Sequence, residues 1–551
     1  MVSVRHLTAG WRVRTVLALG GLLCLLPAAA VTAAAPMPAE DLSKPIRPGE
    51  PGQAPFWNRH ARRFIWAPAF EFEEVPVAKE YRFTVTSDSS GEVHTFVADR
   101  PWRPLSPVWL RLPLGKAVAK VEATGADGPV QVGERTFVKS PSFAGVTRPP
   151  AYPFLESGLR GLRDLLRQRK VTSWLEDNRP DVDYPKWIYP GMMAAATVQG
   201  MVTLARHTAD EKEQASARLV ARRAADFLMT LREPEGAPLA GWPRTYWDGA
   251  QADIQPGFPD QIMSTGPAEA ARAYLDLYDL TQERAYLDFA TGVADTLVRL
   301  QLAEGTWHLW LARATGRAKE PALVVPLAAL RLFNRLIDQY GLAGYTTARD
   351  RAMHYCMDGP LRAMQWDAQF EDTRPKDANR NQSHREPALF AALLFERRQA
   401  GDLAQAEELM RFVEDSFVVW HPADAVTKEP LFKTGSRWNG LDPDFGLDWF
   451  LPAAVEQYAF FTPINASSAD LIEAWMAGYK ASGRRDYLAK AVALATTLTI
   501  AQRYFGGGEI PTHLRRVQPE LNWLNCSVEV ACTLIRHAAE LQSYRIEPSE
   551  R

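Results

Sequence analysis

Apolar and polar residues alternate along short stretches in the first quarter of the chain. The alternation is clearest at 81–86, where Tyr, Phe and Val are separated by Arg and Thr. A period of two is typical of a strand with one buried face. The same signal recurs, with turn residues between the runs, at 94–98, 108–112, 117–123 and 135–139. This spacing predicts a small β-sandwich module over residues 56–146.

In architecture, the module predicted over residues 56–146 resembles a fibronectin-III module.

The period changes after the proline-rich linker 148–153. Apolar residues then recur every three or four positions, which predicts amphipathic helices. The helical patterns run over 155–177, 189–207, 210–232, 262–281, 283–302, 322–340, 346–365, 384–400, 403–419, 446–461, 468–502 and 520–543. The pattern 468–502 is interrupted at Ser482-Gly483, so it contains two helices. The count is therefore thirteen, unless 446–461 belongs to a long loop.

These helices come in pairs. Each amphipathic helix leads into a long loop rich in Trp, Gly and Pro, and then into a second helix. The motif Arg284-Ala-Tyr-Leu-Asp-Phe-Ala returns as Arg485-Asp-Tyr-Leu-Ala-Lys-Ala, which indicates a repeated hairpin. Hairpins of this kind bury their apolar faces only against their neighbours. We therefore predict a mainly α fold, an (α/α)6-type toroid over residues 152–545, with an open solenoid as the alternative.

The helical region resembles the six-hairpin glycosidase-like toroids. Gly241-Trp-Pro, after a helix that contains Leu228-Met-Thr-Leu, is similar to the GGWP turn of helical pectate lyases and glucuronyl C5-epimerases. That class also includes glycoside hydrolases, unsaturated-uronyl hydrolases and polysaccharide lyases. The resemblance implies a carbohydrate substrate and a cleft at the end of the ring where the long loops lie.

The N-terminus has the form of an export signal. A basic leader precedes an apolar run at 16–30, which is too short to span a bilayer comfortably. We expect a signal peptide over 1–33, cleaved after Ala30 or Ala33, and a flexible lead-in over 34–55. The mature protein is then periplasmic or extracellular and not membrane-bound; an uncleaved anchor is the alternative.

Composition narrows the function. The 551 residues carry a formal net charge of −2, which gives no electrostatic reason to expect nucleic acid. Cys356, Cys526 and Cys532 are too few for a disulfide framework, so we interpret them as core residues. No zinc-ligand spacing is present, and we predict no metal and no cofactor.

Two loops supply aromatic residues. Trp242, Tyr246 and Trp247 precede Asp248, and this group could stack on sugar rings beside a carboxylate. The alternative is a buried aromatic loop in which Asp248 is a turn residue.

The second aromatic loop contains Trp307, His308 and Trp310. His308 could act as a general base or contact substrate, or it could simply be a loop histidine.

A polar run opens the helix at 384–400. Ser383 and Glu386 could form a capping box. His384 and Arg385 are unusual in a first turn, where cations oppose the helix dipole, and this favours a functional role. Arg385 could bind a uronate carboxylate bidentately, and Asn381 could assist it.

Two further loops hold candidates. Arg437 and Trp438 precede Asp444 and Asp448, and two carboxylates four residues apart could share a helix face and raise one pKa. The alternative is a helix cap with a first-turn acid. Near the C-terminus, the amides of Asn522 and Asn525 could bind hydroxyl groups or satisfy the backbone.

These candidates predict an exported glycoside hydrolase acting on acidic, uronate-containing oligo- or polysaccharide. Hydrolysis needs two carboxyl groups across the scissile bond. The catalytic candidates are Asp248, His384, Glu386, Asp444 and Asp448. A uronic-acid lyase or C5-epimerase is the alternative, because Asn381, His384 and Arg385 could neutralise a carboxylate and remove the adjacent proton. A non-catalytic glycan-binding surface protein is the third possibility.

Overall fold

The computed structural model describes most of the chain after the leader. The described residues are 40–47, 59, 61, 63–76, 78–125, 128–250, 257–367, 369–371, 381, 383–420, 451–455, 463–514 and 522–546. The expected signal peptide and much of the lead-in lie outside them.

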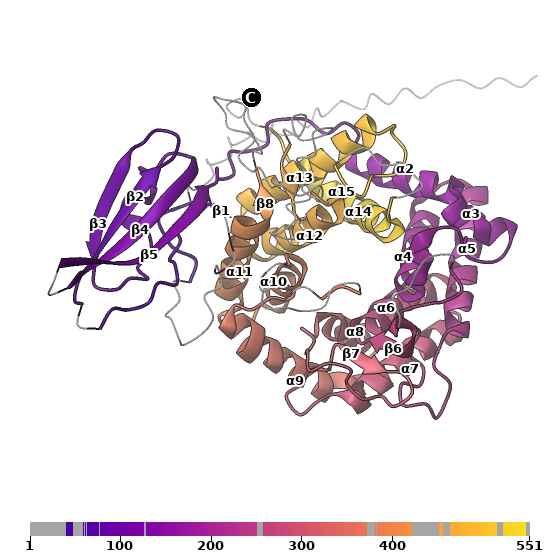
Figure 1. Ribbon diagram of the computed structural model, residues 1–551. Coiled ribbons are helices and arrows are strands. Elements are labelled where there is room, and N and C mark those ends of the chain that lie inside the picture. The colour runs from indigo at the N-terminus through magenta and orange to yellow at the C-terminus, as the bar shows by residue number, and fades with distance from the viewer. Residues whose placement is uncertain are drawn as a thin grey trace, which may run out of the picture. The chain divides into compact units, whose positions relative to one another are not determined.

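Six helices form a closed inner ring among the described residues (Figure 1). Each of them contacts the next in the order α4, α6, α8, α10, α12, α14, and α14 returns to α4. Their bounds are α4 (Pro190–His207), α6 (Thr265–Thr281), α8 (Leu327–Asp338), α10 (Arg385–Arg397), α12 (Asn465–Ser482) and α14 (Leu524–Arg536). The predicted toroid is therefore confirmed, and the open solenoid is not found.

A second set of helices packs outside the ring. It consists of α2 (Phe154–Arg167), α5 (Glu211–Thr230), α7 (Arg284–Leu300), α9 (Thr346–Cys356), α11 (Asp402–Phe417) and α13 (Arg485–Tyr504). Each outer helix packs on the inner helix that comes before it around the ring. These pairs are α5 on α4, α7 on α6, α9 on α8, α11 on α10, α13 on α12 and α2 on α14. In the chain, each outer helix then leads to the next inner helix. Short helices α3 (Arg169–Glu176) and α15 (Ala538–Ser543) and a π-helical turn (Met357–Leu361) extend the outer layer.

The structure resolves the helix count. The pattern 468–502 is two helices, α12 and α13, which meet at Gly483 with a left-handed φ of 72°. Such a conformation suits glycine and ends a helix. The described part of 446–461 contains β9 (Ala453–Ala454), which pairs with β8 (Val418–Val419), so it is not helical there. The ring therefore closes with twelve helices among the described residues.

The first and last hairpins meet closely. A Cβ atom on Gly158 of α2 would lie 2.6 Å from the carbonyl oxygen of Ala531 on α14. Only glycine allows this approach, so we interpret Gly158 as a residue that the closed ring requires.

The N-terminal module is a five-stranded sheet in the order β1-β5-β4-β2-β3. The strands are β1 (Arg63–Phe64), β2 (Tyr81–Ser87), β3 (Val93–Ala98), β4 (Gly115–Gly125) and β5 (Gly128–Lys139), and they are antiparallel except for β1 beside β5. The short helix α1 (Ser106–Trp109) replaces the strand expected at 108–112.

This module differs from a sandwich in one respect. Its described strands lie in a single sheet, and a second sheet does not cover the apolar face. Phe70 and Trp109, from irregular segments and α1, pack there on Phe137 of β5 instead. Period-two patterns predict strands well but do not predict whether strands or loops form the opposite layer.

Two predictions on solubility and cysteines can be examined in the described residues. None of the described helices combines the length and apolar composition needed to span a bilayer. Cys356, Cys526 and Cys532 are all buried, which confirms that they are core residues.

Candidate active site

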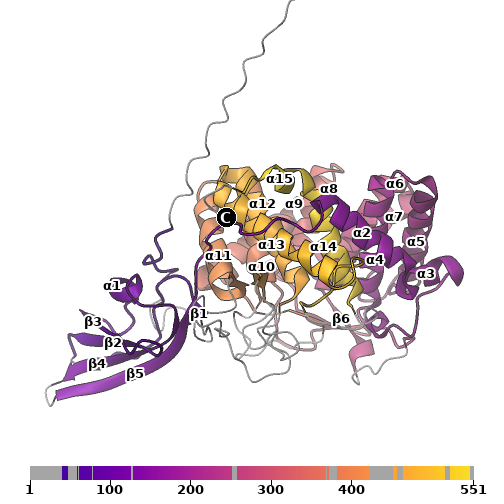
Figure 2. The ribbon, with the colours of Figure 1, turned by 90° about the horizontal axis from the view of Figure 1, so that it is seen from above.

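The long connections lie at one end of the ring. Each inner helix is preceded by a long loop, such as 231–264 before α6, and followed by a short one, such as 282–283 after it. Successive inner helices are parallel, because an antiparallel outer helix separates them in the chain. Their N-terminal ends, with the small strand β6 (Gln261–Met263), therefore share one rim (Figure 2).

Partly exposed residues recur at helical spacing on two inner helices. On α10 they are Arg385, Leu389, Ala392 and Glu396, and the residues between them are buried. On α14 the corresponding positions are Asn525 and Glu529, one turn apart. Since residues three and four apart share a helix face, these side chains face the interior of the ring.

An ion pair spans the ring close to this rim. Arg385 Nη2 lies 2.8 Å from Glu269 Oε1 of α6, and both side chains are about one-third exposed. The guanidinium also interacts with the carboxyl groups of Asp470, Glu529 and Glu386. The charge of Glu269, followed by those other carboxyl groups, holds the pKa of Arg385 well above its ordinary value. Arg385 is therefore a cation surrounded by four acidic groups.

Two of those acids contact each other. Asp470 of α12 is almost fully buried and forms a side-chain hydrogen bond with Glu529 of α14, which is half-buried. Burial, and then the negative charge of Asp470, raise the pKa of Glu529 well above its ordinary value. Two adjacent carboxyl groups share a proton more readily than they both ionise, so this contact favours the protonated form of Glu529.

His384 holds the other side of Asp470. His384 Nε2 lies 3.1 Å from Asp470 Oδ2, and both side chains are about 5% exposed. The imidazole also packs edge-on against Phe417, with ring centroids 6.0 Å apart. His384 is thus enclosed between Asp470 and an aromatic ring.

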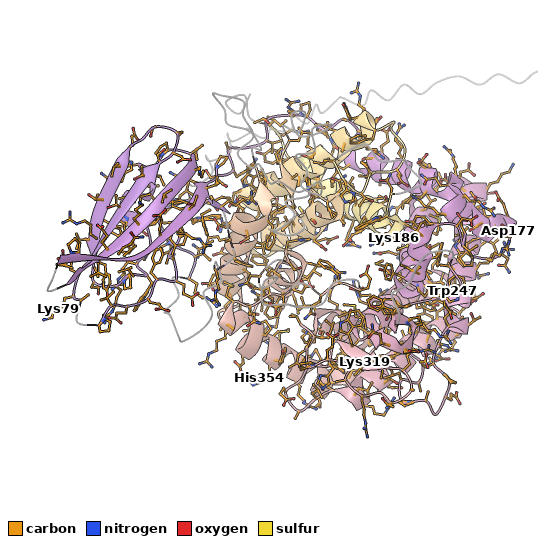
Figure 3. The ribbon with its side chains drawn as sticks, viewed as in Figure 1. Lys79, Asp177, Lys186, Trp247, Lys319 and His354 are labelled. Atoms are coloured by element: carbon orange, nitrogen blue, oxygen red, sulfur yellow. The ribbon has the colours of Figure 1, made fainter. Side chains whose placement is uncertain are left out.

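Lys186 lies at the same rim, just before α4. It belongs to the short 3-10 helix Pro185–Ile188, which leads into α4, and its ammonium nitrogen lies 4.0 Å from the centroid of the Trp523 ring. A second ring, Tyr189, is 5.8 Å away. Figure 3 shows Lys186 at the inner edge of the ring. Within the described part of the chain, Lys186 has these aromatic contacts but no carboxylate partner.

The first aromatic loop is largely a packing loop. Trp242 is fully buried and donates from Nε1 to the carbonyl of Val293, 3.3 Å away. Tyr246 is buried and donates its hydroxyl proton to the carbonyl of Glu371. Neither ring presents an open face, so the expected stacking role does not fit these two residues. Trp247 is half-buried, on the α4–α6 side of the ring (Figure 3), and Asp248 is exposed.

The second aromatic loop also packs inward. Trp307 is buried and donates to the carbonyl of Leu297, and Trp310 is buried and stacks on Tyr246 at 5.9 Å. Both therefore stabilise the loops rather than offer a surface to sugar. His308 is half-buried, and no hydrogen-bond partner of its Nδ1 is found among the described residues.

The residues of the polar run before α10 have two different roles. Asn381 is buried and accepts the backbone N–H of Trp366 at Oδ1, which makes it a structural residue here. Ser383 accepts the N–H of Arg385, and Glu386 is buried with its pKa raised by burial. The helix begins after His384, which makes no side-chain cap hydrogen bond, so the predicted capping box of Ser383 and Glu386 is not formed. His384 and Arg385 instead contact acids of α12 and α6.

The remaining candidates have mixed outcomes. Asp444, Asp448, Arg437 and Trp438 lie outside the described residues. Asn522 is buried, and its Oδ1 accepts the N–H of Thr512, so its amide satisfies the backbone as in the second reading above.

Asn525 remains a substrate-binding candidate. It lies one turn above Glu529 on the inner face of α14. No hydrogen-bond partner of its Oδ1 is found in the described part of the chain.

Sequence reasoning missed three residues of the central cluster: Glu269, Asp470 and Glu529. Each is a single acid among small and apolar residues in the first two turns of an inner helix, as in Pro267-Ala-Glu269-Ala-Ala. An isolated acid on an otherwise apolar helix is the signal that could have found them, because burying a carboxylate without a role is unfavourable.

No known protein-family profile matches the sequence. No curated protein matches it either.

Several solved structures are similar to this chain at low sequence identity. A family 76 glycoside hydrolase from a bovine strain of Bacteroides thetaiotaomicron is 10% identical, with a TM-score of 0.48 over 86% of this chain and 99% of that one. A cellobiose 2-epimerase from Spirochaeta thermophila is 14% identical, with a TM-score of 0.47 over 71% and 99%. An unsaturated glucuronyl hydrolase from Streptococcus agalactiae is 10% identical, with a TM-score of 0.43 over 72% and 95%. These likenesses concern the fold alone, so the chemistry is argued from the cluster itself.

Proposed function

We propose that this chain is an exported carbohydrate-active enzyme, a glycoside hydrolase that acts on acidic oligo- or polysaccharides. One observation carries the proposal. A half-buried carboxyl group, Glu529, lies against Asp470, and burial and the charge of Asp470 raise its pKa, while a second carboxyl group, Glu269, is paired with Arg385 in the same ring interior.

The two glutamates supply the groups that hydrolysis needs. A protonated carboxyl group can donate its proton to the glycosidic oxygen as the bond to the anomeric carbon breaks. An ionised carboxylate can then attack the anomeric carbon or remove a proton from the attacking water. We assign the first role to Glu529 and the second to Glu269, whose ionised form the guanidinium of Arg385 stabilises.

This assignment changes the role of Arg385. The sequence suggests that it binds a substrate carboxylate, but it already pairs with Glu269 and has three other acids around it. A further carboxylate would have to displace Glu269. Arg385 therefore acts better on Glu269 than on substrate.

The geometry favours hydrolysis over a lyase or epimerase reaction. Those reactions need an accessible base next to a neutralised substrate carboxylate. His384 is enclosed and bonded to Asp470, and the hydroxyl group of Tyr246 is engaged with Glu371. Neither side chain presents a free base to the interior of the ring.

The test is incubation with a panel of uronate-containing polysaccharides. New reducing ends without ultraviolet absorbance indicate hydrolysis, which is the expected result. A new C4–C5 double bond, which absorbs in the ultraviolet, would replace the proposal by a lyase. Binding without any product would favour a glycan-binding protein.

Lys186 supports the acidic character of the substrate, because it is a cation at the rim without a carboxylate partner in the described part of the chain. We expect Lys186→Met to lower kcat/KM on an acidic oligosaccharide about tenfold or more, the value of a charge-assisted hydrogen bond. On the same substrate with its carboxyl groups reduced to alcohols, the variant and the wild type should have the same kcat/KM. Lys319→Met, at an exposed lysine of the loop before α8, is the matched control. An equal loss on both substrates would reject an anion site at Lys186.

We also propose export to the periplasm or the medium, on the evidence of the basic and apolar leader. The expected mature protein starts at Val31 or Ala34. Mass spectrometry of the protein from each cell fraction tests this. An intact Met1 in the membrane fraction would indicate an uncleaved anchor instead.

A further inference from the structure

Three side chains form a continuous chain across two inner helices. His384 of α10 bonds to Asp470 of α12 at 3.1 Å, and Asp470 bonds to Glu529 of α14. Exposure increases along this chain: the first two side chains are about 5% exposed, and Glu529 is half-buried and faces the interior of the ring. Only the last of the three is placed to meet a ligand.

We infer that His384 and Asp470 are positioning residues, which keep the Glu529 carboxyl group protonated and directed into the ring. The inference rests on the proposed role of Glu529 as the general acid, and it adds two residues to that role. It also replaces the catalytic role that the sequence suggests for His384.

The hydrogen-bond inventory supports this arrangement. An ionised Asp470 can only accept, so a hydrogen bond between it and Glu529 requires the proton to be on one of the two carboxyl groups. His384 lies against Asp470 and stabilises its negative form if it donates from Nε2. The proton then belongs to Glu529, where a glycosidic oxygen can receive it.

The neighbouring charges act in both directions. Arg385 of α10 and Arg331 of α8 favour the ionised form of Asp470, against the burial that raises its pKa to about 6, and Arg385 also favours the ionised form of Glu529. Glu269 of α6 adds negative charge near Glu529 and opposes its ionisation. Glu473 of α12 is engaged with Arg536 and His537, one turn further into the ring.

The other two elements packed on α14 bring little charge. α4 carries no ionisable side chain before Arg206, near its C-terminal end. α2 packs on the outer side of α14, and its acids have partners of their own. These are Glu156 with Arg160, and Asp164 with Gln168 and the backbone of Glu509.

The arrangement of His384, Asp470 and Glu529 also explains how Glu529 is protonated again after each reaction. Glu529 gives its proton to the leaving oxygen as the glycosidic bond breaks, and two carboxylates are then adjacent. Their repulsion favours return of a proton from water to Glu529. The site is thereby reset for the next substrate without any other co-reactant.

The test is a titration without substrate. The protein is labelled with 13C at glutamate carboxyl groups, and the Glu529 signal is identified by its loss in Glu529→Gln. In Asp470→Asn, which keeps the size of the side chain, removal of the negative charge should lower the pKa of Glu529 by about one unit or more. His384→Gln should produce a smaller shift in the same direction, because Asp470 then loses part of its anionic stabilisation.

Glu473→Gln is the matched control, since it removes an acid from the same helix one turn deeper. It should leave the Glu529 titration unchanged. The basic limb of the pH–rate profile, which reports loss of the acid's proton, should move to lower pH in Asp470→Asn, move less in His384→Gln and stay in place in Glu473→Gln.

Two failures can be distinguished. An unchanged or higher pKa of Glu529 in a folded Asp470→Asn protein would overturn the inference. A lowered pKa together with full turnover in Glu529→Gln would leave the positioning chain in place and would instead overturn the proposed role of Glu529 as the acid.

Discussion

Replacing Glu529 by Gln is expected to lower kcat on a natural acidic oligosaccharide by about 10²–10⁴-fold, the usual contribution of a general acid. The amide keeps the size of the side chain and the contact with Asp470 but cannot release a proton at neutral pH. KM should change little, because Glu529 contributes mainly as the glycosidic bond breaks. The measurement is steady-state kinetics at the pH of maximal activity.

The choice of leaving group separates the acid from its partner. An aryl glycoside with an acidic phenol leaves without protonation, so Glu529→Gln should recover much of its activity on that substrate. Glu269→Gln should remain impaired on both substrates, since its role is at the anomeric carbon or the attacking water. Glu396→Gln changes an acid about three turns beyond Arg385 along α10 and should behave like the wild type.

A different pattern would reassign the site. If Glu529→Gln and Glu269→Gln both keep near-normal rates, the catalytic carboxyl groups lie elsewhere, and the loop that contains Asp444 and Asp448 becomes the first place to examine. If both variants lose activity equally on the aryl glycoside, neither acts as the acid. Folding of each variant is checked by its thermal transition.

The fold was largely predictable because hairpin arrays carry local signals. Period-3.6 patterns, the turn at Ser482-Gly483 and the repeated motif around Tyr286 and Tyr487 all report on neighbouring residues. The pattern at 446–461 misled because apolar spacing alone does not distinguish a helix from an irregular buried segment. The second layer of the β module was missed for a related reason: Phe70 and Trp109 come from segments without any period.

The sequence identified residues of the site only where a polar side chain was unusual for its position in a helix. His384 and Arg385 stood out because cations are unfavourable in a first helical turn, and both belong to the cluster. Trp242 and Trp307 misled, because a loop tryptophan that closes a core and one that stacks on a ligand look the same in sequence. Glu269, Asp470 and Glu529 are about 60 to 260 residues apart along the chain. Only closure of the ring brings them together.

The second large effect concerns stability. Lys490 of α13 is about 2% exposed and lies 2.7 Å from Glu414 of α11, which is equally buried, and 3.1 Å from Glu40. Lys490→Met should lower the free energy of unfolding by about 3–5 kcal/mol, the cost of leaving a buried charge without its partner. Among the described residues, Glu414 would keep one donor, the indole N–H of Trp420. Denaturant titration, or ranking by Tm where unfolding is irreversible, measures the loss.

The loss should depend on pH. Burial raises the pKa of Glu414 to about 7 even with Lys490 in place, and removal of the lysine raises the pKa further. Above the ordinary pKa of glutamate, the unfolded chain has released this proton, whereas Glu414 of the folded variant still holds it. Its stability therefore falls with rising pH from that value up to the raised pKa. Because the wild type shares this dependence up to about pH 7, the gap between wild type and variant should stay nearly constant below about pH 7 and widen above it.

Two matched variants decide whether burial is the cause. Lys480→Met breaks an ion pair with Glu540 in which both side chains are at least one-third exposed, and it should cost less than about 1 kcal/mol. Lys490→Met combined with Glu414→Leu removes both charges and should regain most of the loss, since an apolar pair is commonly as stable as a buried ion pair. If Lys490→Met costs no more than Lys480→Met, Glu414 is already protonated in the native protein. The stability of this region would then depend on packing, such as that of Trp420 on Trp475 of α12, whose rings stack 5.6 Å apart, rather than on charge.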